Sequence, residues 1–217
     1  MIQRTTIRLA AAILCALLAS GCVTGRRVVP LEVPEGGASS GERGEIFVGA
    51  VEDARTFENK PAAPSTPSIT GNVDSLTPEQ KQIFIARQRN GYGKAMGDVV
   101  LPDGQTVPER MRLLIKAGLA SNGYKLTDDS AAPNSATARV DQFWGWFTPH
   151  FATLSFEANV SATITIKHRG KTYELHPKGF GRNQGQVASN ANWQVAYSRA
   201  FDDFLKNFDS ELAKVGH

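Results

Sequence analysis

The most regular feature of the chain is an alternation of apolar and polar side chains over the sixteen residues 152–167. Even positions carry Ala, Leu, Val, Ile or Phe, whereas odd positions carry Thr, Ser, Asn, Glu or Lys. Successive side chains of a strand point to opposite faces, so this period of two predicts a long strand with one face on a core and one toward water. Arg169 and Gly170 then give a hairpin-turn signal, and residues 171–180 are expected to pair back.

The last part of the chain has a helical period instead. Apolar side chains recur every three or four residues from a start near Ser189 or Asn190. Aromatic rings bury about 150–250 Å² each, so this stripe predicts a helix docked on the apolar face of a sheet. The alternative is a helix that binds a partner. The stripe consists of Trp193, Tyr197, Phe201, Phe204, Phe208, Leu212 and Val215.

Shorter patterns predict the remaining elements. Residues 45–51 and 138–147 are expected to form strands. An apolar stripe predicts a helix that opens at Val107 and ends at Gly123, a residue suited to a left-handed C-cap.

The segment between the first strand and that helix combines a loop with a helix start. Residues 57–76 contain three prolines and one glycine, which indicates a long surface excursion. Thr77 and Gln80 are spaced as a capping box, with Pro78 at the first helical position. We expect the helix that begins there to continue to just before Asn90.

Together these elements indicate an α+β fold. Their order favours a two-layer sandwich, with helices packed on one face of a mostly antiparallel sheet. We assign residues 46–217 to this single α+β domain, which is long enough for one ordinary core.

The N-terminus has the proportions of a lipoprotein signal peptide. Arg4 and Arg8 precede an apolar run of about eleven residues. This length lies within the ~7–15 residues usual for the apolar region of a signal peptide and below the ~20 that a helix needs to span a bilayer. Residues 18–22 read Leu-Ala-Ser-Gly-Cys, which resembles a lipobox. Residues 1–21 are therefore expected to be removed and Cys22 to carry the lipid. The alternative is an ordinary secretory signal that leaves Cys22 as a free thiol.

The residues after Cys22 are expected to tether the domain to a membrane. Residues 22–45 are rich in Gly, Pro, Ser and charge, so we interpret them as a flexible tether with an end-to-end distance of roughly 25–30 Å. Val23 stands where Asp would retain an enteric lipoprotein in the inner membrane. We expect anchoring at the periplasmic face of the outer membrane.

Composition excludes several classes of protein. Residues 22–217 carry 22 Lys and Arg against 21 Asp and Glu, so they lack the basic excess of a nucleic-acid binder. The chain has two cysteines, Cys15 and Cys22. Since the first leaves with the signal peptide and the second is consumed by lipid, we expect no disulfide and no thiolate metal site.

No reaction centre is visible in the sequence. The four histidines lack metal-ligand spacing, and His168 and His176, which flank the predicted hairpin, are expected to face solvent. Residues 91–97 are glycine-rich, but they match neither the G-x-G-x-x-G dinucleotide-binding pattern nor a phosphate loop that ends in Gly-Lys-Ser/Thr. We therefore expect no nucleotide. We expect no catalytic residue, no metal, no cofactor and no enzymatic activity.

One aromatic segment is a candidate partner-binding site. Strand alternation places Trp144 and Trp146 on one face, and Phe143 and Phe147 on the other. One interpretation is an exposed aromatic patch that recognises another envelope protein, lipid or glycan. The other is a sheet covered on both faces, by the terminal helix and by residues 57–97.

The chain resembles the YajG family of bacterial outer-membrane lipoproteins over residues 45–213. This resemblance implies an α+β domain on a lipid anchor and no established enzymatic activity. It is carried by the lipobox, the Asp53-Ala54-Arg55 strand end, residues 89–93, residues 107–124, the strand and hairpin from residue 138, and the terminal helix.

The functional expectation is a non-enzymatic accessory or interaction module in envelope or appendage assembly, anchored to the membrane and bound to an envelope protein. The alternative is a lipid- or glycan-binding carrier. A carrier needs an apolar cavity between sheet and helices, whereas a docking module has a filled core.

The lipobox gives the first testable prediction. Cells that express the chain with radioactive fatty acid should label it, and Cys22→Ser should abolish the label because no acceptor thiol remains. Absence of label from the wild-type protein would contradict the lipobox and favour the ordinary secretory signal.

Overall fold

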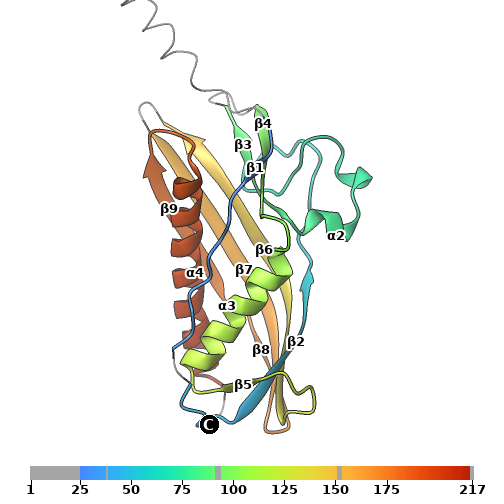
Figure 1. Cartoon of the computed structure of the whole chain (residues 1–217), viewed down its shortest axis with the longest axis vertical. Helices are drawn as coiled ribbons and strands as arrows, with labels where there is room; N and C mark the ends of the chain where they lie inside the picture. The colour runs from blue at the N-terminus through green and yellow to red at the C-terminus, as the bar shows by residue number, and fades with distance from the viewer. Residues whose placement is uncertain (1–24, 38, 91–93, 151–152, 216–217) are drawn as a thin grey trace, which may run out of the picture.

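The computed structural model describes residues 25–37, 39–90, 94–150 and 153–215. The expected signal peptide and Cys22 lie outside the described residues. The described part contains one mixed sheet with helices against it, which confirms the α+β class (Figure 1). The strands are β1 (Arg27–Val28), β2 (Glu45–Asp53), β3 (Phe84–Arg89), β4 (Ala95–Val100), β5 (Lys125–Thr127), β6 (Asn134–Pro149), β7 (Leu154–His168), β8 (Lys171–Leu175) and β9 (Lys178–Gly185). The helices are η1 (Val73–Ser75), α2 (Pro78–Lys81), α3 (Val107–Ser121) and α4 (Asn190–Leu212).

Two long strands, β6 and β7, form the centre of the sheet. They pair antiparallel over almost their full length, and β7 pairs antiparallel with β9 near its start and with β8 near its end. On its other side, β6 pairs in parallel with β2 and then with β3. The long ladders are therefore antiparallel, as the sequence predicts, while β1, β2 and β5 join the sheet in parallel.

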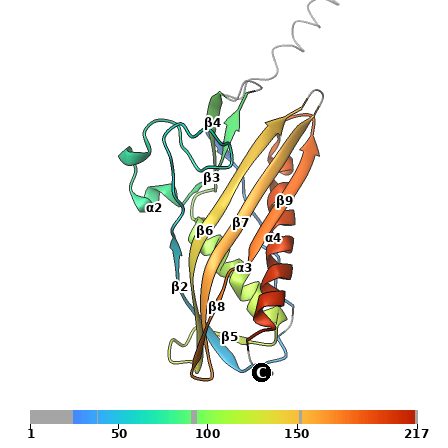
Figure 2. The same ribbon diagram turned by 180° about the vertical axis from the view of Figure 1, so that it is seen from behind.

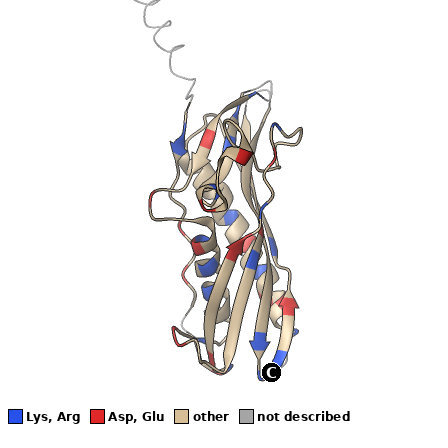
Figure 3. Ribbon diagram, turned by 90° about the vertical axis from the view of Figure 1, so that its right-hand side faces the viewer, with Lys and Arg blue, Asp and Glu red and all other residues tan. Residues whose placement is uncertain are grey.

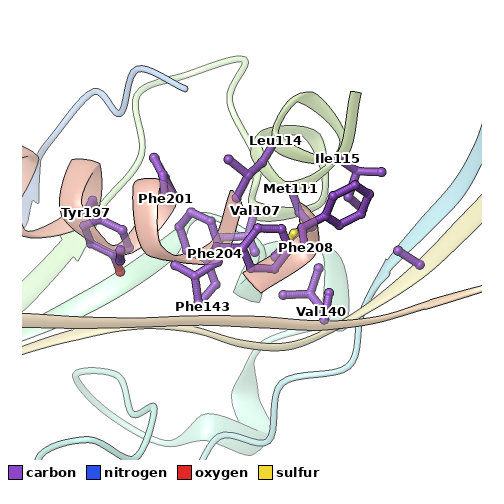
Figure 4. Packing of buried hydrophobic residues seen from close by; sticks show 14 of the residues in the cluster. Val107, Met111, Leu114, Ile115, Val140, Phe143, Tyr197, Phe201, Phe204 and Phe208 are labelled. Atoms are coloured by element: carbon purple, nitrogen blue, oxygen red, sulfur yellow. The ribbon is translucent and has the colours of Figure 1, made fainter. Parts of the chain in front are cut away.

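The helices α3 and α4 cover one face of this sheet (Figures 1 and 4). The aromatic stripe of α4 faces inward, and every member of it is buried to 1% exposure or less. Ser189 caps the helix by accepting a hydrogen bond from the backbone N–H of Asn192. The prediction of a terminal helix docked on the sheet is confirmed.

Glycines let α4 approach β9 directly. A Cβ atom on Gly181 would lie 1.9 Å from the carbonyl oxygen of Ala196, and one on Gly179 would lie 2.0 Å from that of Ala200. Any side chain at either position would push the helix away. The glycine-rich stretch after the hairpin therefore continues the sheet as β9 and seats α4 on it.

Polar side chains of α4 also close the outer edge of β9. The carboxylate of Asp203 accepts a hydrogen bond from the backbone N–H of Phe180 at 2.9 Å, and the amide of Asn207 donates to the carbonyl of Lys178 at 2.7 Å. The guanidinium of Arg199 donates to a third carbonyl of the strand. An open strand edge is a template for pairing with another chain, so these contacts protect the edge.

The prediction that the helix after Thr77 continues to just before Asn90 is wrong. The capping box of Thr77 and Gln80 is present, but α2 ends at Lys81 and β3 begins at Phe84. Phe84, Ile85 and Ala86 are all buried, which a strand covered on both faces achieves. Pairing with β4 and β6 thus overrides the helical start signal.

The prediction of a flexible tether over residues 22–45 is also wrong for residues 25–37, which pack on the domain. We call residues 25–37 the strap, because they run along the layer formed by α3 and α4 (Figure 1). Val29 and Leu31 are 0% and 2% exposed. Gln194 of α4 donates a hydrogen bond to the carbonyl of Pro30 at 3.0 Å, and a Cβ atom on Gly36 would lie 2.7 Å from the carbonyl oxygen of Ala117 in α3.

A buried ion pair lies where β6 exchanges one neighbour for another. β6 pairs with β2 as far as Val140 and with β3 at Gly145. Just after β2, the fully buried side chain of Arg55 forms an ion pair of 2.7 Å with Asp53, whose side chain is 6% exposed.

The guanidinium of Arg55 also joins three segments of backbone. It donates to the carbonyl of Phe84 in β3 at 2.7 Å, to that of Phe143 in β6 at 2.8 Å and to that of Lys81 at 3.2 Å. Each guanidinium nitrogen therefore has an acceptor, as a buried charge requires. One side chain, Arg55, therefore stabilises the point where β6 changes its partner from β2 to β3.

Replacing Arg55 should test this role. Arg55→Met should lower the free energy of unfolding by about 3–5 kcal/mol, because it leaves a buried carboxylate unpaired. Arg139 and Asp141 form a matched control at the same two-residue spacing, with an Arg side chain that is 60% exposed. Arg139→Met should cost below about 1 kcal/mol. Chemical denaturation followed by circular dichroism measures both, and equal losses would contradict the assignment.

Candidate functional site

The aromatic segment of β6 does not form an exposed patch. Phe143 and Phe147 are 0% and 7% exposed and point toward the helices, where Phe143 stacks on Tyr197 at 5.2 Å between ring centroids. Trp144, on the opposite face, is 1% exposed. Its ring meets Phe57 edge-on at 5.9 Å, and its Nε1–H donates to the carbonyl of Pro64 at 3.2 Å.

Trp146 is the remaining member of the predicted site. It is half-buried, and its ring lies 6.5 Å from that of Phe180, which is 47% exposed. The exposed-patch interpretation is therefore wrong, and the interpretation of a sheet covered on both faces holds at this position. The loop segment before β3 makes that cover.

No helix covers the half of this sheet face that includes β8 (Figure 2). The hydroxyl of Thr163 donates to Asp141 at 2.8 Å, and Nε2 of His176 lies 3.0 Å from a carboxylate oxygen of Glu174. Among the residues that the structure describes, no group of three His, Cys, Asp or Glu side chains is placed to hold a metal ion. This part of the face carries paired polar side chains.

His168 is buried, so the expectation that it faces solvent is wrong. It is 2% exposed, and its Nδ1 lies 3.1 Å from the hydroxyl of Tyr124, which is fully buried. Its Nε2 has no hydrogen-bond partner among the described residues. Burial lowers the pKa of His168, and the guanidinium groups of Arg169 and Arg43 lower it further.

A groove lies between the strap and α3. It has a volume of about 870 Å³ and opens to solvent. Leu113 and Leu126 line it and are 38% and 36% exposed, which is unusual for leucine in this chain. Its lining residues are Pro30, Leu31, Glu32, Val33, Pro34, Glu35, Gly36, Gly37, Gln105, Arg110, Leu113, Lys116, Ala117, Ala120 and Leu126.

The walls of this groove carry opposite charges. Glu32 and Glu35 belong to the strap, whereas Arg110 and Lys116 belong to α3. These two cations pair with Glu109 at 3.0 Å and with Asp128 at 3.7 Å. Arg110 also donates to the carbonyl of Leu31 at 3.4 Å, which ties the two walls together. The groove thus has an apolar floor between an acidic rim on the strap and a rim of ion-paired basic side chains on α3.

The sequence analysis missed this groove, although α3 carries a signal for it. Leu113, Ala117 and Ala120 are spaced as one helical stripe, beside the stripe of Met111, Leu114, Ile115, Gly118 and Leu119 that packs inward. A helix with two apolar stripes contacts something on both sides. The position of the strap, which follows no strong pattern, hid the second contact.

The space between the sheet and the helices is filled by side chains. Figure 4 shows rings of α4 stacked over Phe143 and Val140 of the sheet, with residues of α3 beside them. Trp193 packs edge-on against Phe156 at 5.0 Å.

In the described part of the chain, no helix is long and apolar enough to cross a membrane.

Comparison with known proteins yields similar structures only. No family model and no curated protein matches the chain. Protein XCC0632 from Xanthomonas campestris, of the DUF330 family, is 9% identical and covers 87% of this chain and 94% of its own, with a TM-score of 0.47. An uncharacterised protein is 10% identical, covering 88% and 95%, with a TM-score of 0.38. The hypothetical protein CT253 from Chlamydia trachomatis is 10% identical, covering 82% and 98%, with a TM-score of 0.33.

The buried imidazole predicts a pH dependence of stability. The unfolded chain binds a proton at His168 near the ordinary pKa of about 6.5, whereas the folded chain binds it only at lower pH. The contribution of His168 to the free energy of unfolding is therefore complete above that pH and is lost as the pH falls toward the folded pKa.

Denaturation of wild type and His168→Asn at several pH values measures this effect. The stability difference between the two proteins should shrink from pH 7.5 to pH 5, since Asn does not titrate. Parallel pH profiles would show that the buried histidine is not responsible.

Proposed function

We propose that this chain is a lipid-anchored protein of the YajG type at the periplasmic face of the outer membrane, and that it acts by binding another envelope protein rather than by catalysis. The lipobox at residues 18–22 supports the anchor. The observation that carries the binding role is the groove beside the strap, whose lining holds Leu113 and Leu126, two of the six large apolar side chains that are exposed among the described residues.

The charges of the groove favour a protein segment as its occupant. A uniformly charged ligand, such as a nucleic acid, would be repelled by one of the two rims. An extended segment with apolar side chains between charged residues of both signs complements the floor and both rims at once. Leu113 and Leu126 would make the apolar contacts. Glu32 would make an ionic contact, and so would Lys116 by exchanging its partner Asp128 for a carboxylate of the bound segment.

The filled core favours this function over a carrier of lipid or glycan. Phe143 and Tyr197 stack at 5.2 Å where a cavity between sheet and helix would have to lie. A carried molecule would have to displace these rings, and removing a large aromatic contact of this kind costs about 3–5 kcal/mol. The open groove requires no such rearrangement.

Site-specific photo-crosslinking in intact cells tests the proposal. A benzophenone amino acid at Leu113 should yield one discrete adduct that protease degrades. Leu126→Glu should remove most of that adduct, because a carboxylate would then stand on the apolar floor. Phe180→Glu is the matched control, since Phe180 is 47% exposed and lies on β9, and it should leave the adduct unchanged.

Two results would contradict the proposal. An adduct that persists in Leu126→Glu would show that the groove is not its site. An adduct with the mass of a lipid or glycan would support the carrier instead.

A further inference from the structure

The first described residue is fixed at one end of the sheet. The backbone N–H of Gly25 donates to the carbonyl of Met96 in β4 at 3.3 Å, and β1 then pairs with β4. A Cβ atom on Gly97 would lie 2.0 Å from the carbonyl oxygen of Gly25, so the two backbones are in direct contact. The strap therefore begins beside the β3–β4 hairpin.

Covalent geometry limits how far the anchor can lie from this end. Cys22 and Gly25 are three residues apart, and a chain spans at most about 3.6 Å per residue, so their Cα atoms are within roughly 11 Å. A free tether of residues 22–45 would have allowed two to three times that distance. If lipid holds Cys22 at the bilayer surface, the β3–β4 end of the domain is held there too.

This end of the domain is basic. Residues 25–28 and 84–98 carry five Lys and Arg but only one acidic residue, Asp98. That carboxylate is 6% exposed and accepts a hydrogen bond from the backbone of Thr70, so it faces inward. Arg26 and Lys94 are exposed. Figure 3 shows several Lys and Arg segments, with Asp and Glu segments beside them, at the end where the described chain begins.

The charge is local rather than general. Residues 22–217 have a net charge of +1, so the residues outside these two segments are net acidic. The neighbouring residues 54–83 hold three basic and three acidic side chains and add no net charge. The basic excess thus coincides with the anchored end.

We propose that the β3–β4 end of the domain rests on the membrane surface and contacts anionic lipid headgroups through Arg26 and Arg27, with residue 94 close to the same surface. This orientation rests on the proposed lipid anchor at Cys22. Each basic residue close to an anionic surface contributes about 1 kcal/mol, and the attraction acts only within about 8–10 Å, the range to which the three-residue link confines this end.

The orientation stands the long strands away from the bilayer. β7 has fifteen residues, so at ~3.3 Å per residue it extends roughly 50 Å from this end. The β7–β8 hairpin and the end of α4 lie at the opposite end of the molecule (Figures 1 and 2). The groove beside the strap then lies between the two ends, on the side of the domain.

Two single-cysteine variants test the orientation in the full lipidated chain. Lipid occupies Cys22, so a bimane fluorophore attached to Lys94→Cys reports on the basic end, and one attached to Lys171→Cys reports on the β7–β8 hairpin. The lipoproteins are placed in phosphatidylethanolamine–phosphatidylglycerol vesicles with headgroup spin labels. Most of the fluorescence should be quenched for Lys94→Cys and almost none for Lys171→Cys.

Charge reversal tests the contact itself. In the labelled Lys94→Cys protein, a further Arg26→Glu and Arg27→Glu change should reduce quenching several-fold, and raised salt should do the same. Lys171→Glu is the matched control and should have no effect. Insertion of twenty Gly and Ser residues between Thr24 and Gly25 should also reduce quenching, because it removes the covalent limit.

The outcomes separate this inference from the proposed function. A chain that carries no lipid and does not float with vesicles would overturn the anchor. A chain that floats but shows equal quenching at both positions would overturn the orientation and leave the anchor standing. Quenching at Lys94→Cys that charge reversal and salt leave unchanged would overturn the headgroup contact.

Discussion

The fold depends on how the sheet divides at the guanidinium of Arg55. A long strand such as β6 has one free side, and two different strands use it in succession. Backbone carbonyls at such a junction lose their regular partners, and water cannot replace them beneath a covered surface. Arg55 supplies donors in a fixed planar fork and carries its counter-ion, Asp53, two residues away on the same chain. The loop that buries Trp144 lies on the same junction, because it departs from β2 at this point.

The sequence predicts the parts of the fold whose patterns are local. The alternation in β7, the aromatic stripe of α4 and the helix α3 with left-handed Gly123 after its end each follow from the local sequence, and the structure has all three. It does not predict β3, because burial between β4 and β6 decides that segment's conformation after the capping box. Nor does it predict the strap, since a segment rich in Gly and Pro carries no period and binds by a few contacts to distant helices. Because residues of the strap form one wall of the groove, a sequence pattern that does not predict the strap does not predict the groove either.

One helix, α4, meets both margins of the sheet. Asn190 and Gln194 bond the strap near β1, while Asp203 and Asn207 bond β9. The inward face of the same helix supplies the rings that fill the core. Helical spacing alone would assign these polar residues to solvent, but in the structure they hydrogen-bond to the strap and to the edge strand β9. The groove beside α3, in contrast, leaves the apolar side chains of Leu113 and Leu126 exposed.

The contacts of the strap with α4 join residues far apart in sequence, since Pro30 and Gln194 are separated by 164 positions. The contacts of the strap with α4 therefore cannot form until the last helix has formed, and contacts of such long range form slowly. The segment that follows the N-terminus thus completes its contacts only when the C-terminal helix is in place. The seating of the strap on α4 then records whether folding is complete.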